Sequence, residues 1–188
     1  MENNKYIKNV AIVALKLLLI CAVVAGVVSF VYTATLDAYN TNIERETLQS
    51  MAAIFGAGEN DEITLESYEV DPDSNIKEFY GVKVNGENVG YCIKVIAKGF
   101  GGDMNLMVGY YPDKTIRGVS IVSHAETPGV GSKVNDANYL SQYNGLTGGL
   151  EISKRGDKDI TSVSGATISS KAVHAAIEEA SAAIALIQ

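Results

Sequence analysis

The sequence has 188 residues, with 15 Lys and Arg against 22 Asp and Glu and a net charge of −7 at pH 7. This length allows one domain of ordinary size with a hydrophobic core, together with a smaller appendage. The acidic balance argues against nucleic acid and anionic lipid surfaces as partners, because both require a basic patch. The two cysteines and two histidines show no metal-ligand spacing, so any redox centre must be an organic cofactor or be absent.

An apolar segment near the N-terminus predicts a transmembrane helix at 9–32. From Val10 to Val31 the sequence carries a single charge, Lys16, which can reach back toward the lipid headgroups. At about 1.5 Å per residue this segment spans a hydrocarbon layer of roughly 30 Å. A cleavable signal peptide is the alternative, but its apolar core would be only about 7–15 residues long. We therefore expect a retained anchor.

The charges on either side of this segment predict its orientation. Lys5 and Lys8 precede it and Lys16 lies toward its N-terminal side, whereas Asp37 and Glu44 follow it. The positive-inside rule then predicts a cytoplasmic N-terminus at 1–8 and an extracytoplasmic location for the rest of the chain. Beyond Val31 there are 12 basic and 21 acidic residues, so this part has a net charge of −9.

The segment after the anchor predicts a stalk helix within residues 33–60. Its apolar residues recur at helical spacing between Asp37 and Phe55, and Gly56 and Gly58 are expected to end the helix. The remaining residues, 61–188, form the predicted extracytoplasmic domain.

The first half of this domain predicts an antiparallel meander. Residues 63–70 alternate as a strand does, and Asn85-Gly86 lies between two further alternating runs, which is the strongest short signal for a hairpin. A second turn is expected at 112–114, between two more strands.

The second half predicts short elements and a terminal helix. A short helix is expected near 138–146, and brief extended pieces at 150–154 and 159–165. The last twenty or so residues form an amphipathic pattern whose apolar face consists of Val173, Ile177, Ala180 and Ile184. The predicted fold class is α+β: one transmembrane helix followed by one antiparallel sheet with packed helices.

The sequence Ser164-Gly165-Ala166-Thr167 comes directly before the terminal helix. Gly165 permits backbone conformations that other residues resist, and Ala166 lets a large group approach. Thr167 is placed where unpaired backbone N–H groups and the helix dipole favour an anion such as phosphate. The alternative is that Thr167 or a neighbouring serine only caps the helix.

Two motifs resemble a known family. "SGATISS" resembles the flavinylation motif of the FMN-binding domain in the G subunit of the Rnf complex and in the C subunit of the sodium-translocating NADH:quinone reductase. "HAETPGVGSK" (124–133) is similar to the ETPG-x-G segment of the same domain. The order of anchor, sheet, ETPG loop, S-G-A-T and terminal helix also matches. The short chain resembles the Rnf G subunit more than the longer reductase subunit.

The resemblance implies a phosphoester bond between FMN and Thr167, with Ser164, Gly165 and Ala166 shaping the turn. Lys171, about one turn into the helix, would neutralise phosphate charge, or it is a solvated lysine. The family often has an acidic residue six places before the modified threonine. Here Thr161 stands there, and Asp159 is the nearest acid.

The second motif implies a loop, Glu126-Thr127-Pro128-Gly129, against the isoalloxazine ring of FMN. Pro128 would stiffen it, Gly129 would allow close approach, and Thr127 would hydrogen-bond the ring edge. An ordinary exit from a strand is the alternative. His124, just before the loop, is interpreted as structural rather than as a proton carrier.

The function implied by the resemblance is that of a membrane-anchored electron carrier in an Rnf-type ferredoxin:NAD⁺ oxidoreductase. Its FMN would pass single electrons between an iron–sulfur subunit and a flavin-containing one, and a separate flavin transferase using FAD and Mg²⁺ would attach it. No catalysis is expected of the isolated subunit. The alternatives are a signal-anchored sensor or interaction domain without a redox cofactor, and a secreted carrier cleaved after Thr33.

Overall fold

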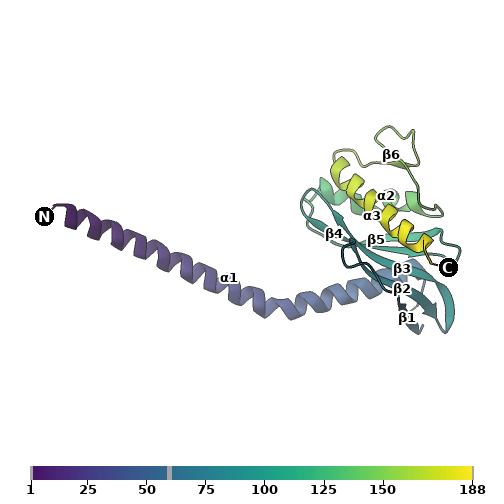
Figure 1. Cartoon of the computed structure of the whole chain (residues 1–188), viewed down its shortest axis with the longest axis horizontal. Helices are drawn as coiled ribbons and strands as arrows, with labels where there is room; N and C mark the ends of the chain where they lie inside the picture. Colours follow the sequence, from purple (N-terminus) through teal and green to yellow (C-terminus); the bar gives the residue numbers. More distant parts are fainter. Residues whose placement is uncertain (1, 59–60, 188) are drawn as a thin grey trace. The chain divides into compact units, whose positions relative to one another are not determined.

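The structure is a computed structural model that describes residues 2–58 and 61–187 (Figure 1). The chain divides into two compact units, Met1–Glu44 and Arg45–Gln188.

The first unit belongs to a long helix, α1 (Glu2–Phe55). Its segment Ala14–Thr35 has a mean hydropathy of 2.6 and no buried residues, so it is long and apolar enough to cross a membrane. This segment overlaps the span predicted at 9–32. The predicted anchor and stalk are thus parts of one helix, which ends at Phe55 because Gly56 adopts a left-handed φ of +68°.

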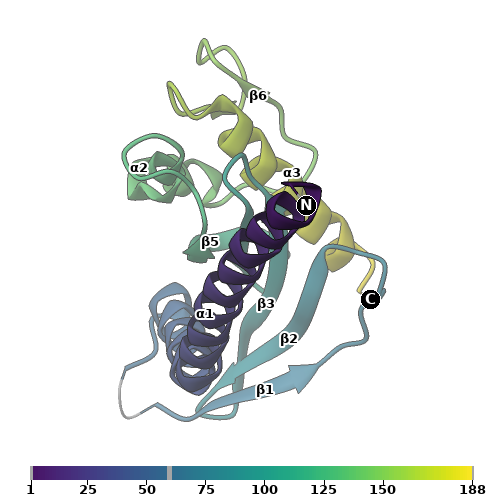
Figure 2. The same ribbon diagram turned by 90° about the vertical axis from the view of Figure 1, so that its left-hand side faces the viewer.

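A five-stranded antiparallel sheet forms the centre of the second unit, with the strands in chain order. Figure 2 shows β1, β2 and β3 side by side. The β2–β3 connection is the predicted hairpin, in which Asn85 and Gly86 have φ of 53° and 84° as a type I′ turn requires. The strands are β1 (Ile63–Ser67), β2 (Ile76–Val84), β3 (Glu87–Lys98), β4 (Asp103–Tyr110) and β5 (Ile116–His124).

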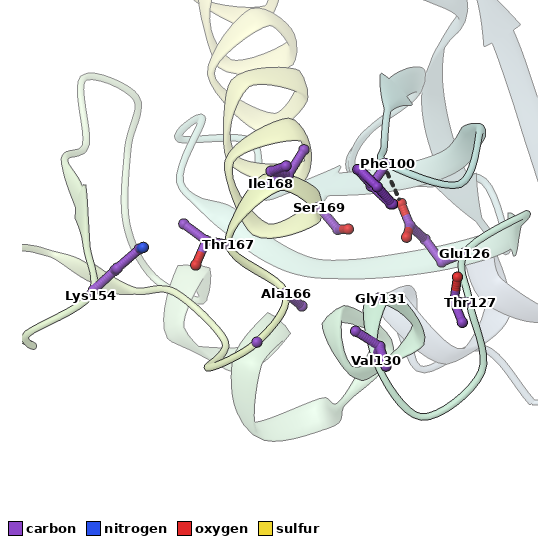
Figure 3. A pocket seen from close by; sticks show the side chains of 11 residues that line it. Phe100, Glu126, Thr127, Val130, Gly131, Lys154, Ala166, Thr167, Ile168 and Ser169 are labelled. Atoms are coloured by element: carbon purple, nitrogen blue, oxygen red, sulfur yellow. Dashed lines mark hydrogen bonds between the residues drawn. The ribbon is translucent and has the colours of Figure 1, made fainter.

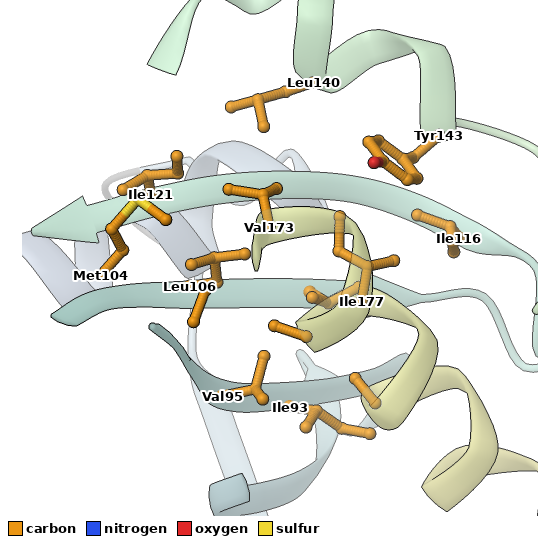
Figure 4. Close-up of a cluster of buried hydrophobic side chains, with 14 of the residues drawn as sticks. Ile93, Val95, Met104, Leu106, Ile116, Ile121, Leu140, Tyr143, Val173 and Ile177 are labelled. Carbon is orange, nitrogen blue, oxygen red and sulfur yellow. The ribbon is translucent and has the colours of Figure 1, made fainter. Parts of the chain in front are cut away.

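One face of the sheet packs against the terminal helix α3 (Thr167–Ala185). Figure 4 shows Val173 and Ile177 of this helix above Val95 and Leu106 of the sheet. Burial of each such side chain stabilises the fold by about 1.5–3 kcal/mol. All members of the predicted apolar face are buried, namely Val173, Ile177, Ala180 and Ile184.

The opposite face of the sheet packs against the last turns of α1. Side chains alternate along a strand, so Cys92 and Met107 face away from α3 and contact Met51 and Phe55 of α1 instead. Burial raises the pKa of the Cys92 thiol to about 12, so the thiol stays protonated and acts as an apolar packing group.

Backbone carbonyls at the end of α1 are satisfied within the protein. Ala57 N–H donates to Ala52 O at 3.0 Å, which is the six-to-one bond of a Schellman motif. The Arg117 guanidinium donates from Nε to Ile54 O at 2.9 Å and from Nη2 to Phe55 O at 2.8 Å. The C-terminal end of α1 is therefore closed.

The helices and strands between β5 and α3 are all short. The helix predicted near 138–146 is a single turn, α2 (Ala137–Leu140), which Asp136 caps by accepting from Asn138 N–H. It continues into the 3-10 helix η2 (Ser141–Tyr143). Another 3-10 helix, η1 (Gly131–Asn135), precedes α2, and the two predicted extended pieces pair as parallel strands, β6 (Ile152–Ser153) and β7 (Ile160–Thr161).

Candidate functional site

A pocket of about 480 Å³ lies where the β3–β4 turn, the loop after β5 and the first turn of α3 meet (Figure 3). Its volume falls within the range of about 300–1,000 Å³ that is usual for small-molecule sites. Most of its walls are apolar, and a few polar groups point inward. The residues that line it are Phe100, Glu126, Thr127, Val130, Gly131, Lys154, Gly165, Ala166, Thr167, Ile168 and Ser169.

The Glu126 side chain holds two glycine-rich segments together at one wall of this pocket. Its Oε1 accepts from Phe100 N–H at 2.7 Å and from Gly101 N–H at 3.3 Å, although the side chain is only 5% exposed. A Cβ atom at Gly99 or at Gly131 would collide with the carboxylate oxygens. Glycine at both positions therefore lets the backbone approach Glu126 closely from two sides.

The opposite wall is the N-terminus of α3, which no side chain caps. The N-cap residue is Ala166, and the nearby Ser170 hydroxyl instead accepts from Val163 N–H at 3.0 Å. Within the described chain, the backbone N–H groups of residues 167–169 have no protein acceptor. The interpretation of Thr167 or a neighbouring serine as only a helix cap is therefore wrong, and these donors stay open to an anion.

The structure brings the two sequence motifs together across the pocket. Gly165, with φ of +83°, makes the sharp turn that leads into α3. The residues from the predicted site that line the pocket are Glu126, Thr127, Gly165, Ala166 and Thr167. The predicted residues that do not belong to its lining are Ser164, Pro128, Gly129 and Lys171, and Lys171 is exposed.

Other residues of the pocket escaped sequence reasoning. Lys154, next to β6, points toward Thr167 in Figure 3, so the lysine at the pocket is not the one predicted on α3. Ser169 lines the pocket and is 2% exposed. A signal for Ser169 was available, because it lies two residues after Thr167 in the first turn of a predicted helix. No comparable sequence signal pointed to Lys154, because its position depends on the pairing between β6 and β7.

The mouth of the pocket has an apolar rim. Phe100, Ile168 and Val130 all line the pocket, yet they are 75%, 58% and 51% exposed. They come from the β3–β4 turn, α3 and the loop after β5, respectively. Exposed apolar side chains at the mouth of a pocket are typical of ligand and partner sites.

Known proteins share both the domain and the organisation of the chain. A family model described as the FMN-binding domain matches residues 99–182, which include every residue of the pocket. The G subunit of the ion-translocating oxidoreductase complex of Methanosarcina acetivorans is 31% identical over 183 residues, covering 93% of this chain and 96% of that protein.

The fold and site thus define an FMN-binding domain that follows a helix of membrane-spanning length, and FMN is its cofactor. The chain belongs to the family of G subunits of ion-translocating oxidoreductase complexes.

Further relatives carry more specific names. The G subunit of the proton-translocating ferredoxin:NAD(+) oxidoreductase complex of Clostridium ljungdahlii is 34% identical, covering 55% of this chain and 58% of that protein. The Na(+)-translocating counterpart of Acetobacterium woodii is 29% identical, covering 82% and 80%. The solved structure of Shewanella oneidensis NqrC is 20% identical, with a TM-score of 0.47, covering 69% of this chain and 80% of that one.

The residues present in the pocket fit FMN. Open N–H groups at the start of α3 suit its phosphate, and the apolar walls suit its aromatic ring. Gly99 and Gly131 let the backbone close around Glu126, which keeps this carboxylate at the wall of the pocket.

Proposed function

We propose that this chain is a membrane-anchored electron-transfer subunit that carries FMN in phosphoester linkage to Thr167. The observation that supports this most is the uncapped N-terminus of α3, where Thr167 is the first helical residue and lines the pocket. A helix that only needed stability would be expected to have a capping side chain here, since a cap contributes about 0.5–2 kcal/mol.

In this proposal, different residues around Thr167 contact the phosphate and the ring of FMN. The N–H groups of residues 167–169 donate to the phosphate, and the positive end of the α3 dipole favours its charge. Lys154 adds a positive charge from the β6–β7 loop, in place of the predicted Lys171. Phe100, Val130 and Ile168 shield the ring from water. When bound, FMN supplies the redox chemistry, since its ring takes up and releases electrons one at a time.

Attachment requires a separate flavin transferase that uses FAD and Mg²⁺. The Thr167 hydroxyl oxygen forms a new bond to the phosphorus atom of the FMN half of FAD. The pyrophosphate bond of FAD breaks, AMP leaves, and the hydroxyl proton is lost to the solvent. Access of an enzyme to this turn is consistent with the exposure of the adjacent Ile168, which is 58% exposed.

The location of the anchored domain explains why FMN would be attached covalently. The lysines before the apolar segment favour a cytoplasmic N-terminus, and the FMN-binding domain is then extracytoplasmic. A cofactor held there by affinity alone would be lost by dilution. A covalent bond to an anchored domain keeps it at high effective concentration near its partners.

The partners in this proposal are other membrane subunits of an Rnf-type ferredoxin:NAD⁺ oxidoreductase complex. One would carry an iron–sulfur centre and another a flavin, with the FMN of this chain exchanging electrons between them. The names of the relatives from Clostridium and Acetobacterium support this assignment. The exposed rim of the pocket is the surface through which such exchange would occur.

The experiment that tests the proposal is production of the full chain together with the transferase, followed by denaturation and measurement of retained flavin fluorescence. Thr167→Val keeps the branched shape and removes the hydroxyl, and we expect it to lose all covalent flavin while the far-UV circular dichroism stays unchanged. Ser67→Ala is the control and should keep its flavin, because Ser67 is an exposed residue of β1 that lies outside both the S-G-A-T sequence and the pocket lining. Flavin retained by Thr167→Val after denaturation would contradict the proposal.

A further inference from the structure

Two buried polar side chains line the interior of the pocket from opposite walls. Ser169 of α3 is 2% exposed and Glu126 of the loop after β5 is 5% exposed. Both line the pocket, and Figure 3 shows the Ser169 hydroxyl directed toward the Glu126 carboxylate. Side chains buried to this degree almost always have hydrogen-bond partners.

The protein satisfies only part of this pair. Both N–H donors to Glu126 use Oε1, and the described residues provide no hydrogen bond or ion pair to Oε2. The Ser169 hydroxyl likewise makes no hydrogen bond to any residue in the described ranges. A free acceptor and a free hydroxyl therefore face the same apolar space, where a ligand group can pair with both.

The chemistry of the isoalloxazine ring matches this arrangement at one edge only. Its pyrimidine edge carries the N3–H donor between two carbonyl acceptors, whereas the opposite edge carries two methyl groups. The rim residues Phe100, Val130 and Ile168 are apolar and suit the methyl edge. The reverse orientation would bury a methylated edge against a carboxylate and leave both polar side chains unpaired.

We propose that Glu126 and Ser169 read the pyrimidine edge of the flavin ring and thereby fix its orientation in the pocket. Oε2 of Glu126 accepts from N3–H, the Ser169 hydroxyl donates to an adjacent ring carbonyl, and the methyl edge faces the rim. This inference rests on the proposed function, because it requires FMN in this pocket. The pair also gives specificity for an alloxazine-type ring over an apolar aromatic ring of similar size.

The decisive experiment measures ionisation of the flavin N3–H in the loaded full chain. A carboxylate that accepts from N3–H disfavours the N3 anion, since the anion loses the hydrogen bond and faces a like charge. At the pH where free FMN is half ionised, we expect the folded protein to show about tenfold less of the N3 anion by absorbance. Circular dichroism at that pH confirms the fold, and denatured protein supplies the unshifted reference.

Three variants separate the roles of the two side chains. Glu126→Gln keeps an acceptor for the backbone N–H groups but removes the charge, so N3 ionisation should move most of the way back to that of free FMN. Ser169→Ala should shift a flavin carbonyl band in the infrared spectrum to higher frequency, because that carbonyl loses a hydrogen bond. Ser67→Ala, an exposed position of β1 outside the lining, should change neither signal.

The results distinguish this inference from the function on which it depends. A loaded protein in which N3 ionises as in free FMN would overturn the ring orientation and leave the attachment at Thr167 intact. Unchanged carbonyl bands in Ser169→Ala would overturn the role of that hydroxyl even if Glu126→Gln fails to fold. A protein that gains no flavin at Thr167 contradicts the proposed function itself.

Discussion

The C-terminus of α1 and the N-terminus of α3 differ in whether the protein itself satisfies their backbone hydrogen-bonding groups. At the C-terminus of α1, Arg117 donates to the carbonyls of Ile54 and Phe55, and Gly56 turns the chain away. At the N-terminus of α3, Ala166 offers no side-chain cap, and three N–H groups open into a pocket. The first end is completed by the protein, and the second is left for a ligand.

The same difference is seen in the packing beside the sheet, where one region is filled by α1 and another leaves a pocket next to α3. Where α1 packs, the space beside glycines is filled: Ile54 fits against Gly109 and Gly118, which lie opposite each other on β4 and β5. Where α3 begins, Gly99 and Gly131 pack around Glu126, and the neighbouring volume stays empty. In the proposed function, this unsatisfied helix end is where the phosphate of FMN binds.

The largest effect on stability is expected from removing the side chain that satisfies the C-terminus of α1. Arg117→Ala removes two hydrogen bonds to α1 and the stacking of the guanidinium on Phe55 and Tyr111, at 5.2 and 5.0 Å from the ring centres. We expect the free energy of unfolding to fall by about 2–4 kcal/mol. Urea unfolding of the full chain in detergent, followed by tyrosine fluorescence, measures this change.

The same variant should still accept flavin at Thr167, because Arg117 does not line the pocket. A loss below about 1 kcal/mol would mean that surface water closes this helix end as well as the arginine does.

A smaller effect is expected from the glycine pair beneath α1. In Gly109→Ala the new Cβ would collide with the Ile54 side chain, whereas in Gly118→Ala it would lie 3.6 Å away, at ordinary contact distance. We expect Gly109→Ala to lower the free energy of unfolding by about 1–3 kcal/mol, and Gly118→Ala to change it by less than about 0.5 kcal/mol. Equal values for the two variants in the same urea titration would show that Ile54 does not seat between them.

The smallest effect is expected from closing the open end. Ala166→Ser supplies a capping hydroxyl at the N-cap of α3, so we expect the flavin-free protein to gain about 0.5–2 kcal/mol of stability. The same hydroxyl competes for the N–H groups that hold phosphate, so attachment of FMN should become slower. Urea unfolding and a time course of attachment measure the two changes.

A gain in stability without slower attachment of FMN would contradict this prediction, because it would mean that the N–H groups at the start of α3 do not bind the phosphate. Ala166→Val is the control for side-chain size, since it adds bulk without a hydrogen-bond acceptor.

Much of the fold could be predicted because local patterns determine it. The Asn85-Gly86 hairpin and the apolar face of α3 appeared as expected, since turn chemistry and helical spacing are properties of short segments. The pairing of β6 with β7, and hence the position of Lys154, depends on contacts between distant residues, and no short pattern encodes it.

The candidate site was predicted in part for the same reason. Thr167 and Glu126 were found through their motifs, but the structure shows Glu126 bound to Phe100 and Gly101 rather than only facing the pocket. Lys171 was chosen for its place on the helix, and it is exposed outside the lining. Motifs identify the chemistry, whereas packing decides which neighbour supplies each charge.

The most direct test of the central claim is an intact mass of the full chain from a host that contains the transferase, with peptide mapping of residues 159–171. We predict a gain of one FMN less one water, located on Thr167. An unmodified peptide from that host would contradict this prediction, because the open end of α3 would then have no covalent ligand.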